Sequence, residues 1–240
     1  MSALVRRPGS APPGTRERAA DLEDAPAVRA CLKRVRPRFV FHLAASTDHS
    51  LAPEAVERVL RTNVLGSLAL LRAAAGVRGL KRVVTVGSTE EYGRARAPFG
   101  EDSRGIPANA YALSKLCVTE LCRTLHSALG LPCVVLRPTV VYGPGQGPGM
   151  FVPDLLRALR KGRTFPMTTG LQTRDFLYVD DLVEALLRAA VAPGAEGRIF
   201  NVGAGRPARV IEVARLARRL AGRGTLKPGA LARRPGEAVR

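Results

Sequence analysis

Several residue types are scarce in this sequence of 240 residues. It contains no tryptophan, 5% aromatic residues, four cysteines and three histidines. Aromatic side chains are too few for the stacking surfaces on which single-stranded nucleic acids bind. The cysteines and histidines have no metal-ligand spacing, so we expect no metal site and four reduced core cysteines. These are Cys31, Cys117, Cys122 and Cys133.

Long apolar runs are also absent from the sequence. No stretch of about eighteen apolar residues occurs, as a membrane-spanning helix would require. The first residues, MSALVRRPGSAPPGTRER, include no apolar segment of the kind found in secretory signals. We therefore expect a cytoplasmic protein that does not span a membrane.

Acidic residues are outnumbered by basic ones, 20 against 38, and the formal net charge is +18. Such a charge is compatible with a polyanionic partner. However, only five of the basic residues are lysines, and the arginines are scattered along the chain. We expect a solvated, arginine-rich surface with a preference for anionic ligands, and no nucleic-acid partner.

Short β-rich runs alternate with helical patterns, which is typical of parallel βαβ units. Strands are predicted over 38–44, 82–88 and 132–138, and helices over 56–75 and 109–130. The strands are almost continuously apolar, which indicates a sheet covered on both faces. The predicted class is α/β, with a doubly wound, Rossmann-like parallel sheet.

The pattern becomes irregular after residue 143, where YGPGQGPGMF forms a glycine- and proline-rich loop. We predict a dinucleotide-binding domain over residues 1–143. Residues 144–240 mostly form a smaller substrate-binding lobe, with part of 174–205 returning to the main domain.

Tyr111 and Lys115 lie four residues apart and therefore on one face of the predicted helix. A phenol is a poor base at neutral pH, and a nearby cation favours its ionised form. Ser88, at the end of a predicted strand, can hold the same substrate oxygen. Each residue alone is weak evidence, because lysine on a helix is usually solvated and serine after a strand is usually a turn residue.

Seven motifs in order carry more information than this pair. They are FHLAAST (41–47), TNVLGSLALL (62–71), VVTVGSTEEYG (83–93), NAYALSKLCVTEL (109–121), VVLRPTVVYGPGQ (134–146), RDFLYVDDLVEAL (174–186) and FNVGAG (200–205). Together they resemble the extended short-chain dehydrogenase/reductase superfamily. More narrowly, they resemble its NAD-dependent epimerase/dehydratase family, whose members act on nucleotide sugars.

The resemblance implies a role for several side chains. Tyr111 would be the acid/base, and Lys115 would bind the nicotinamide ribose and lower the pKa of Tyr111. Ser88 would bind the reacting substrate oxygen. Asn63 would stabilise the active-site helix, although a helix-surface amide is the alternative. The other implied cofactor contacts are Ala44 and Ala45, for which simple packing is the alternative, and Asp21 and Leu22 at the adenine.

Two further residues are implied at the substrate. Glu90 resembles the glutamate that 4,6-dehydratases use as base at C5 of the sugar, whereas Glu91 is expected to be solvent-facing or structural. Arg174 resembles an arginine that binds the substrate diphosphate, with an ion pair to Asp175 or Asp180 as the alternative. We expect Asp180 or Asp181 to cap the following helix.

The family's glycine-rich phosphate turn is not found before FHLAAST. SALVRRPGS resembles the family's second strand, so the first βα unit is missing from the predicted fold. Arg6 and Arg7 lie where basic residues would meet an NADP 2′-phosphate, and both NAD and NADP remain open. Val140 replaces an asparagine that many members carry. Either the start of this sequence has been set too far downstream, or the chain is a shortened copy of a family member.

Two hypotheses about function follow. The first is an NAD(P)-dependent sugar-nucleotide epimerase, 4,6-dehydratase or 4-reductase that uses Ser88, Tyr111 and Lys115 for hydride transfer at sugar C4. The alternative is a catalytically silent remnant that binds a nucleotide sugar or a protein partner. The resemblance also implies a homodimer formed by the helices that hold Tyr111 and Asn63.

Overall fold

The computed structural model describes residues 1–95 and 97–232. Residues 96 and 233–240 are left out, so the end of the predicted lobe at 144–240 lies outside the described residues. No helix in the described part of the chain is long and apolar enough to cross a membrane.

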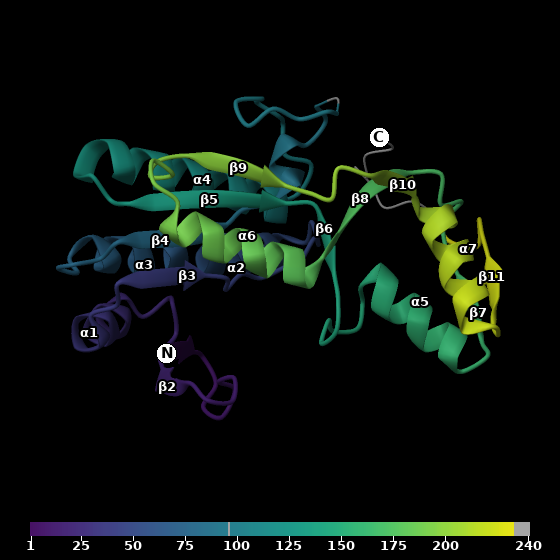
Figure 1. Ribbon diagram of the computed structural model, residues 1–240, viewed down its shortest axis with the longest axis horizontal. Coiled ribbons are helices and arrows are strands. Elements are labelled where there is room, and N and C mark those ends of the chain that lie inside the picture. The colour runs from purple at the N-terminus through teal and green to yellow at the C-terminus, as the bar shows by residue number, and fades with distance from the viewer. Residues whose placement is uncertain (96, 233–240) are drawn as a thin grey trace.

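A four-stranded parallel sheet forms the centre of the molecule, in the order β3-β4-β5-β9 (Figure 1). These strands are Phe39–His42, Arg82–Val86, Cys133–Pro138 and Ile199–Val202. The strands predicted from apolar runs are therefore present, and β9 joins them from the C-terminal half of the chain. This arrangement confirms the predicted α/β class with a Rossmann-like parallel sheet.

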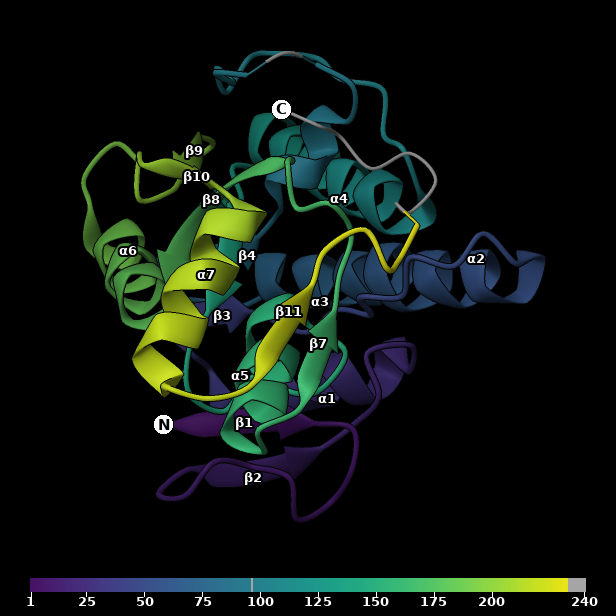
Figure 2. The same cartoon turned by 90° about the vertical axis from the view of Figure 1, so that its right-hand side faces the viewer.

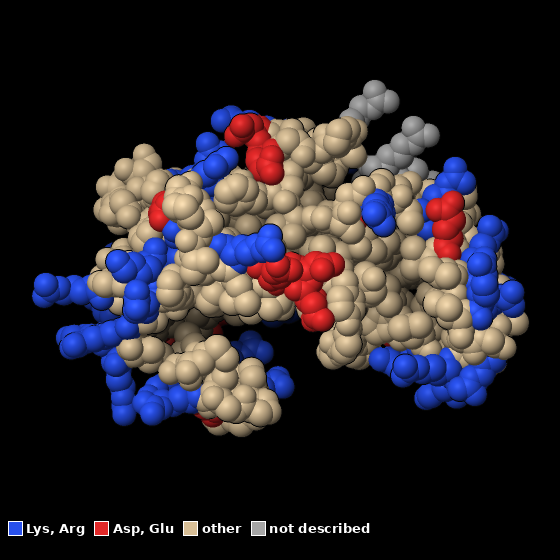
Figure 3. Space-filling model, viewed as in Figure 1, with Lys and Arg blue, Asp and Glu red and all other residues tan. Residues whose placement is uncertain are grey.

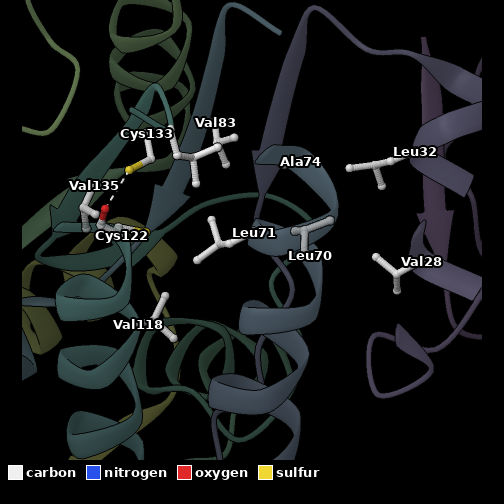
Figure 4. Packing of buried hydrophobic residues seen from close by; sticks show 11 residues of the cluster. Val28, Leu32, Leu70, Leu71, Ala74, Val83, Val118, Cys122, Cys133 and Val135 are labelled. Carbon is white, nitrogen blue, oxygen red and sulfur yellow. Dashed lines mark hydrogen bonds between the residues drawn. The ribbon is translucent and has the colours of Figure 1, made fainter. Parts of the chain in front are cut away.

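Helices cover both faces of this sheet (Figures 1 and 2). One face packs against α1 (Ala25–Val35), α3 (Gly66–Ala75) and α4 (Ala110–Leu129), and the other against α6 (Val179–Val191). Alternation along β5 explains this double coverage: Cys133 and Val135 face the first layer, and Val134 and Leu136 face α6. Figure 4 shows the core of the first layer, where Cys133 Sγ donates to the Cys122 carbonyl at 3.0 Å.

The predicted helix over 56–75 is longer and less regular than expected. It begins at Pro53 as α2 (Pro53–Leu60), passes through a π-helical turn at Arg61–Leu65, and continues as α3. The next helix, α4, begins where the Asn109 side chain accepts a hydrogen bond from Ala112 N at 2.8 Å. It ends at Gly130, whose left-handed φ of 65° closes the helix as predicted.

The first two strands form a separate parallel pair, β1 (Ser2–Val5) with β2 (Arg16–Ala19). Neither strand pairs with the central sheet. Leu4 and Leu22 nevertheless pack against the same apolar cluster as α1 and α3. The described residues thus contain no strand between this pair and β3, in agreement with the predicted lack of a first βα unit.

The C-terminal segments build a smaller lobe with its own core (Figure 1). Its three-stranded sheet, in the order β10-β8-β6, contains Pro207–Arg209, Thr173–Tyr178 and Val140–Tyr142. A second pair joins β7 (Thr164–Pro166) and β11 (Thr225–Lys227), and α5 (Phe151–Arg160) packs with α7 (Val210–Ala221). The 3-10 turn η2 (Thr89–Tyr92) lies in the main body after β4.

Basic side chains gather at both ends of the face drawn in Figure 3. Between them an acidic patch lies at the start of α6, whose first turn carries Asp180 and Asp181. The prediction that one of these aspartates caps α6 is wrong. The N-cap position is Tyr178, which makes no side-chain capping bond, and both carboxylates are exposed inside the first turn.

Candidate active site

Ser88, Tyr111 and Lys115 meet beyond the carboxyl end of β4. Ser88 follows this strand, and α4 presents Tyr111 and Lys115 one turn apart toward it. The Ser88 hydroxyl lies near the Tyr111 phenol, where it favours the ionised form of the phenol. Lys115 Nζ lies 5.8 Å from the centre of the Tyr111 ring. The structure therefore brings the three residues together, at the edge of a parallel sheet where ligands usually bind.

Lys115 is held by the strand that carries Ser88. Its Nζ donates a hydrogen bond of 2.7 Å to the carbonyl of Val86, the last residue of β4. Burial lowers the pKa of Lys115 to about 8, although the nearby Glu91 carboxylate favours the charged form. The ammonium is thus mostly protonated at neutral pH.

Tyr111 has a pKa that differs from the one we expected. Burial, with a contribution from the Glu90 charge, raises the pKa of the Tyr111 phenol to about 12, and the nearby Ser88 hydroxyl only partly opposes this. We expected Lys115 to lower this pKa below its ordinary value. In the structure burial outweighs any such effect, so the phenol holds its proton at neutral pH.

Glu91 is completely buried. Of the two roles expected for it, the solvent-facing one is therefore wrong, and the structural one is left. Its carboxylate accepts hydrogen bonds from Ser88 N at 2.8 Å, Thr119 Oγ1 at 2.8 Å and Arg137 Nε at 2.7 Å. Arg137 also donates to the Tyr92 hydroxyl at 2.9 Å. This network ties β4, α4 and β5 together and fixes the backbone of Ser88.

Glu90 lies on the open side of the same turn. Its Oε1 is 3.2 Å from His49 Nε2, and its Oε2 accepts a hydrogen bond of 3.3 Å from Asn109 Nδ2. Burial favours the neutral acid, but the bond and charge of His49, with Asn109 and the Arg174 charge, lower the pKa of Glu90 overall. Glu90 is therefore an ionised carboxylate. It lies close enough to Tyr111 for its charge to help raise the pKa of the phenol.

His49 is a site residue that the sequence interpretation missed. Its ring centre lies 4.9 Å from that of Tyr111, at an interplanar angle of 47°. Its sequence signal is slight: a histidine in the irregular segment after the strand that ends at His42. Only the folded chain brings this segment over α4.

Asn63 is buried in the π-helical turn, so the alternative of a helix-surface amide is wrong. Its Oδ1 accepts a hydrogen bond of 2.7 Å from Ser46 N, and its Nδ2 donates to the Ser46 carbonyl and Ser114 Oγ, both at 2.9 Å. Asn63 thereby connects α4, between Tyr111 and Lys115, to the segment after β3. In that segment Ala44 is exposed and Ala45 is half-buried.

Three predicted cofactor residues lie at the separate β1-β2 pair. Arg6 follows β1 and is exposed, and Asp21 follows β2, where its Oδ1 accepts a hydrogen bond from Glu23 N at 3.0 Å. Leu22 packs closely on α3, because a side chain at Gly66 would meet the Leu22 Cβ at 3.0 Å. Their contacts with a cofactor remain predictions.

Arg174 lies on β8 of the smaller lobe, and its positive charge is one of the groups that lower the pKa of Glu90. One guanidinium nitrogen donates to the Thr173 carbonyl at 2.8 Å. The adjacent Asp175 accepts hydrogen bonds from Ala204 N at 3.2 Å and Gly205 N at 3.0 Å, and so holds the FNVGAG loop. The lobe thus brings a cation toward Glu90.

Fold and site together define a class of protein, namely α/β proteins of the short-chain dehydrogenase/reductase type. Comparison with known proteins narrows the class. The model of the NAD dependent epimerase/dehydratase family matches residues 2–203. The chain belongs to this family.

Relatives in this family are about one third identical to the chain over the aligned residues. The dTDP-D-glucose 4,6-dehydratase of Bos taurus is 32% identical over 197 residues, covering 81% of this chain and 55% of the relative. The UDP-glucose 4-epimerase of Mycolicibacterium smegmatis is 35% identical over 193 residues, covering 78% and 60%. The chain thus spans little more than half the length of the relatives it matches.

Solved structures agree with this assignment. MoeE5 in complex with UDP-glucuronic acid and NAD superposes with a TM-score of 0.88 at 32% identity, covering 99% of this chain and 79% of MoeE5. The family is NAD-dependent, and NAD is present in this solved neighbour.

The residues present fit one end of such a dinucleotide. A buried lysine, a phenol and a serine hydroxyl suit a nicotinamide and its ribose. Among the described residues before β3, no glycine-rich turn at the start of a helix is present to bind the diphosphate end of the dinucleotide. The loop after β1 leads into a strand rather than a helix, and Gly9 and Gly14 stand in open space with no atom within 4 Å of an added Cβ.

Proposed function

We propose that this chain carries the reaction site of an NAD(P)-dependent sugar-nucleotide epimerase, 4,6-dehydratase or 4-reductase, with chemistry at sugar C4. The observation that carries the proposal is the meeting of Ser88, Tyr111 and Lys115 beyond β4, with Lys115 Nζ 5.8 Å from the Tyr111 ring centre. The dinucleotide, when bound, accepts and returns the hydride of the sugar carbon.

The protein side chains would move and hold the proton at the sugar oxygen. Because its pKa is about 12, Tyr111 keeps its proton and can donate it to the oxygen of a 4-keto group. The Lys115 ammonium stabilises the phenolate that this transfer leaves. Ser88, which lies near Tyr111, would orient the same oxygen.

Glu90 favours a dehydratase among these three reactions. It is the ionised carboxylate beside Tyr111, and a base of this kind can remove the proton from C5 that precedes loss of the C6 hydroxyl. Asn109 and His49 hold both of its oxygens. The same position is compatible with 4-reductase chemistry, in which no C5 proton is removed.

Nucleoside diphosphate sugars are the proposed substrates. The named relatives act on dTDP-D-glucose and UDP-glucose, and MoeE5 holds UDP-glucuronic acid. Arg174, presented by β8, would bind the diphosphate as a guanidinium fork. Residues 144–240 would then form most of the substrate-binding lobe, opposite a dinucleotide-binding domain at 1–143.

The test is direct turnover by the purified chain. It is incubated with UDP-glucose or dTDP-glucose and with NAD⁺ or NADP⁺, and NMR distinguishes a C4 epimer from a 4-keto-6-deoxy sugar. Tyr111→Phe should abolish either product, whereas Tyr178→Phe on the exposed end of β8 should not. Full activity of Tyr111→Phe would refute the role of the phenol.

A second candidate function is binding without turnover. It is favoured by the open loop after β1, which offers no diphosphate cradle in the described residues. Isothermal titration separates the two: a nucleotide sugar that binds while NADH and NADPH do not would favour this alternative. We also propose a cytoplasmic homodimer formed by the helical segments that hold Asn63 and Tyr111, namely the π-helical turn at Arg61–Leu65 and α4, where Leu65 and Leu113 are exposed.

A further inference from the structure

His49 and Glu90 form a polar pair beside the Tyr111 ring. His49 belongs to the segment between β3 and α2, and Glu90 to the turn η2 after β4, 41 residues further along the chain. His49 Nε2 lies 3.2 Å from Glu90 Oε1, and the ring centres of His49 and Tyr111 are 4.9 Å apart. The two side chains of the pair are 31% and 46% exposed. An imidazole and a carboxylate thus meet on the accessible side of the candidate active site.

Loss of the C6 hydroxyl from a 4-keto sugar needs two proton transfers. A base takes the proton from C5, and the electron pair of the C5–H bond forms the C5=C6 double bond. The C6–O bond breaks in the same event and its electrons stay with the oxygen. Hydroxide is a poor leaving group, so this oxygen takes up a proton and departs as water. Glu90 suits the base because it is ionised, and for the same reason it cannot supply the second proton.

Three side chains near Glu90 influence its charge, namely His49, Asn109 and Arg174. The amide of Asn109 does not titrate, and the guanidinium of Arg174 keeps its protons in proteins. An imidazole both gives and takes a proton near neutral pH. Thr89, which precedes Glu90, has only a hydroxyl, and this donates to a main-chain carbonyl of β5 at 3.3 Å. Of these groups, His49 alone has the chemistry of a general acid.

The other titratable side chains described around this turn have different partners. Tyr111 would serve the oxygen at C4, and Lys115 Nζ donates to a main-chain carbonyl of β4 at 2.7 Å. Glu91 is 1% exposed and lies in an ion pair with a buried arginine. Asp48, the neighbour of His49 in sequence, pairs with Arg58 at 2.7 Å. These contacts leave the proton of the C6 oxygen to another group.

We propose that His49 is the general acid that protonates the departing C6 hydroxyl, a role that rests on the function proposed for this chain. C4, C5 and C6 of a hexose are bonded in succession. A sugar whose C4 oxygen meets Tyr111 therefore brings C5 and the C6 oxygen toward the adjacent pair. Glu90 takes the C5 proton, His49 Nε2 gives its proton to the C6 oxygen, and water leaves.

The pair also restores itself after the step. Elimination leaves Glu90 protonated and His49 neutral, the reverse of the starting ion pair. Because Oε1 and Nε2 lie 3.2 Å apart, the proton can return directly from the carboxyl group to the imidazole. The charge of His49 lowers the pKa of Glu90, so the ion pair is the favoured arrangement. One proton thus circulates within the pair, and this step needs no external acid or base.

A change of leaving group distinguishes a general acid from a residue that only positions Glu90. The full chain is incubated with NAD⁺ and the UDP or dTDP form of either glucose or 6-deoxy-6-fluoroglucose. Fluoride is a far weaker base than hydroxide and leaves without first taking a proton. Fluorine NMR measures fluoride release, and proton NMR measures the 4-keto-6-deoxy product from glucose.

His49→Gln is the informative variant, because its amide can still donate a hydrogen bond to Glu90 but cannot transfer a proton. Elimination from the glucose substrate should fall at least about a hundredfold, whereas fluoride release should change little. Asp48→Asn is the control. Its side-chain oxygen can still accept from Ser50 N, and both rates should be almost unchanged. Equal losses on the two substrates, or no loss on glucose, in His49→Gln would overturn the proposal.

A third sugar separates this role from the proposed function. The UDP or dTDP form of 6-deoxyglucose has no leaving group at C6, so it reports chemistry at C4 alone through the absorbance of NADH. Oxidation of this sugar by a wild-type chain that releases neither water nor fluoride would refute the role of His49 and leave the chemistry at C4 standing. Failure to oxidise any of the three sugars would refute the proposed function and, with it, the role of His49.

Discussion

Glu91 and Arg137 form an ion pair inside the protein, with Glu91 Oε2 2.7 Å from Arg137 Nε and side chains only 1% and 4% exposed. The arginine comes from β5, and the glutamate from the turn that follows β4. The second carboxylate oxygen accepts the backbone N–H of Ser88. A charge pair that the sequence does not reveal thus positions one of the residues proposed for catalysis.

Glu91→Gln should destabilise the fold strongly, because it leaves the Arg137 guanidinium buried without its counter-charge. Removing one partner of a buried pair typically costs about 3–5 kcal/mol. Urea denaturation at pH 7 measures the free energy of unfolding. Glu120→Gln is the matched control, since its pair with Arg123 at 3.8 Å lies on the surface and should change stability by less than about 1 kcal/mol. Equal effects of the two variants would contradict this prediction.

Lys115→Met should reveal the pH dependence of a buried amine. The pKa of Lys115 in the fold is about 8, below its ordinary value of 10.5. The wild type should gain stability relative to this variant as the pH rises from about 8 to 10.5, because only the unfolded chain still holds the proton in that range. The gain is at most about 3 kcal/mol. A stability difference that stays constant over this range in urea titrations would refute the prediction.

His42 should make the protein sensitive to acid. Burial, with the Lys115 charge, lowers the pKa of His42 to about 4, and its Nε2 is 2.7 Å from Ser67 Oγ. The unfolded chain binds a proton near pH 6.5, so stability is present above that pH and is lost as the pH falls toward 4.

His42→Phe should therefore flatten the loss of stability between pH 6.5 and 4, by up to about 3 kcal/mol. The Ser67 hydroxyl still donates to the Asn63 carbonyl in this variant, so no buried donor is left unpaired. Chemical denaturation at several pH values gives the two slopes. Identical slopes for the variant and the wild type would show that His42 does not carry the acid sensitivity.

Asn63→Leu should loosen the segment after β3. The variant removes three hydrogen bonds to Ser46 and Ser114 and leaves the Ser46 backbone groups without partners, a loss of about 2–4 kcal/mol. Hydrogen exchange should become faster over residues 44–50. The neighbouring Thr62→Val removes one bond to Glu23 at the surface and is the control. Unchanged exchange at 44–50 in Asn63→Leu would contradict the role assigned to the amide.

Local patterns predicted much of the fold, because apolar runs and helical periodicity depend on neighbouring residues. The strands around Val84 and Val134 and the α4 helix from its Asn109 cap to Gly130 were all predicted. The π-helical turn at Arg61–Leu65 was not, since Asn63 takes its place there through bonds to Ser46 and Ser114, distant in the chain. Long-range pairing of this kind leaves no periodic signal.

The sequence by itself determined the class of fold, the family and the one-turn spacing of Tyr111 and Lys115. Only the tertiary structure decided that Tyr111 has a raised pKa, that His49 reaches Glu90 and that Glu91 is buried against Arg137. Burial and charge are properties of the folded environment, which many distant segments create together.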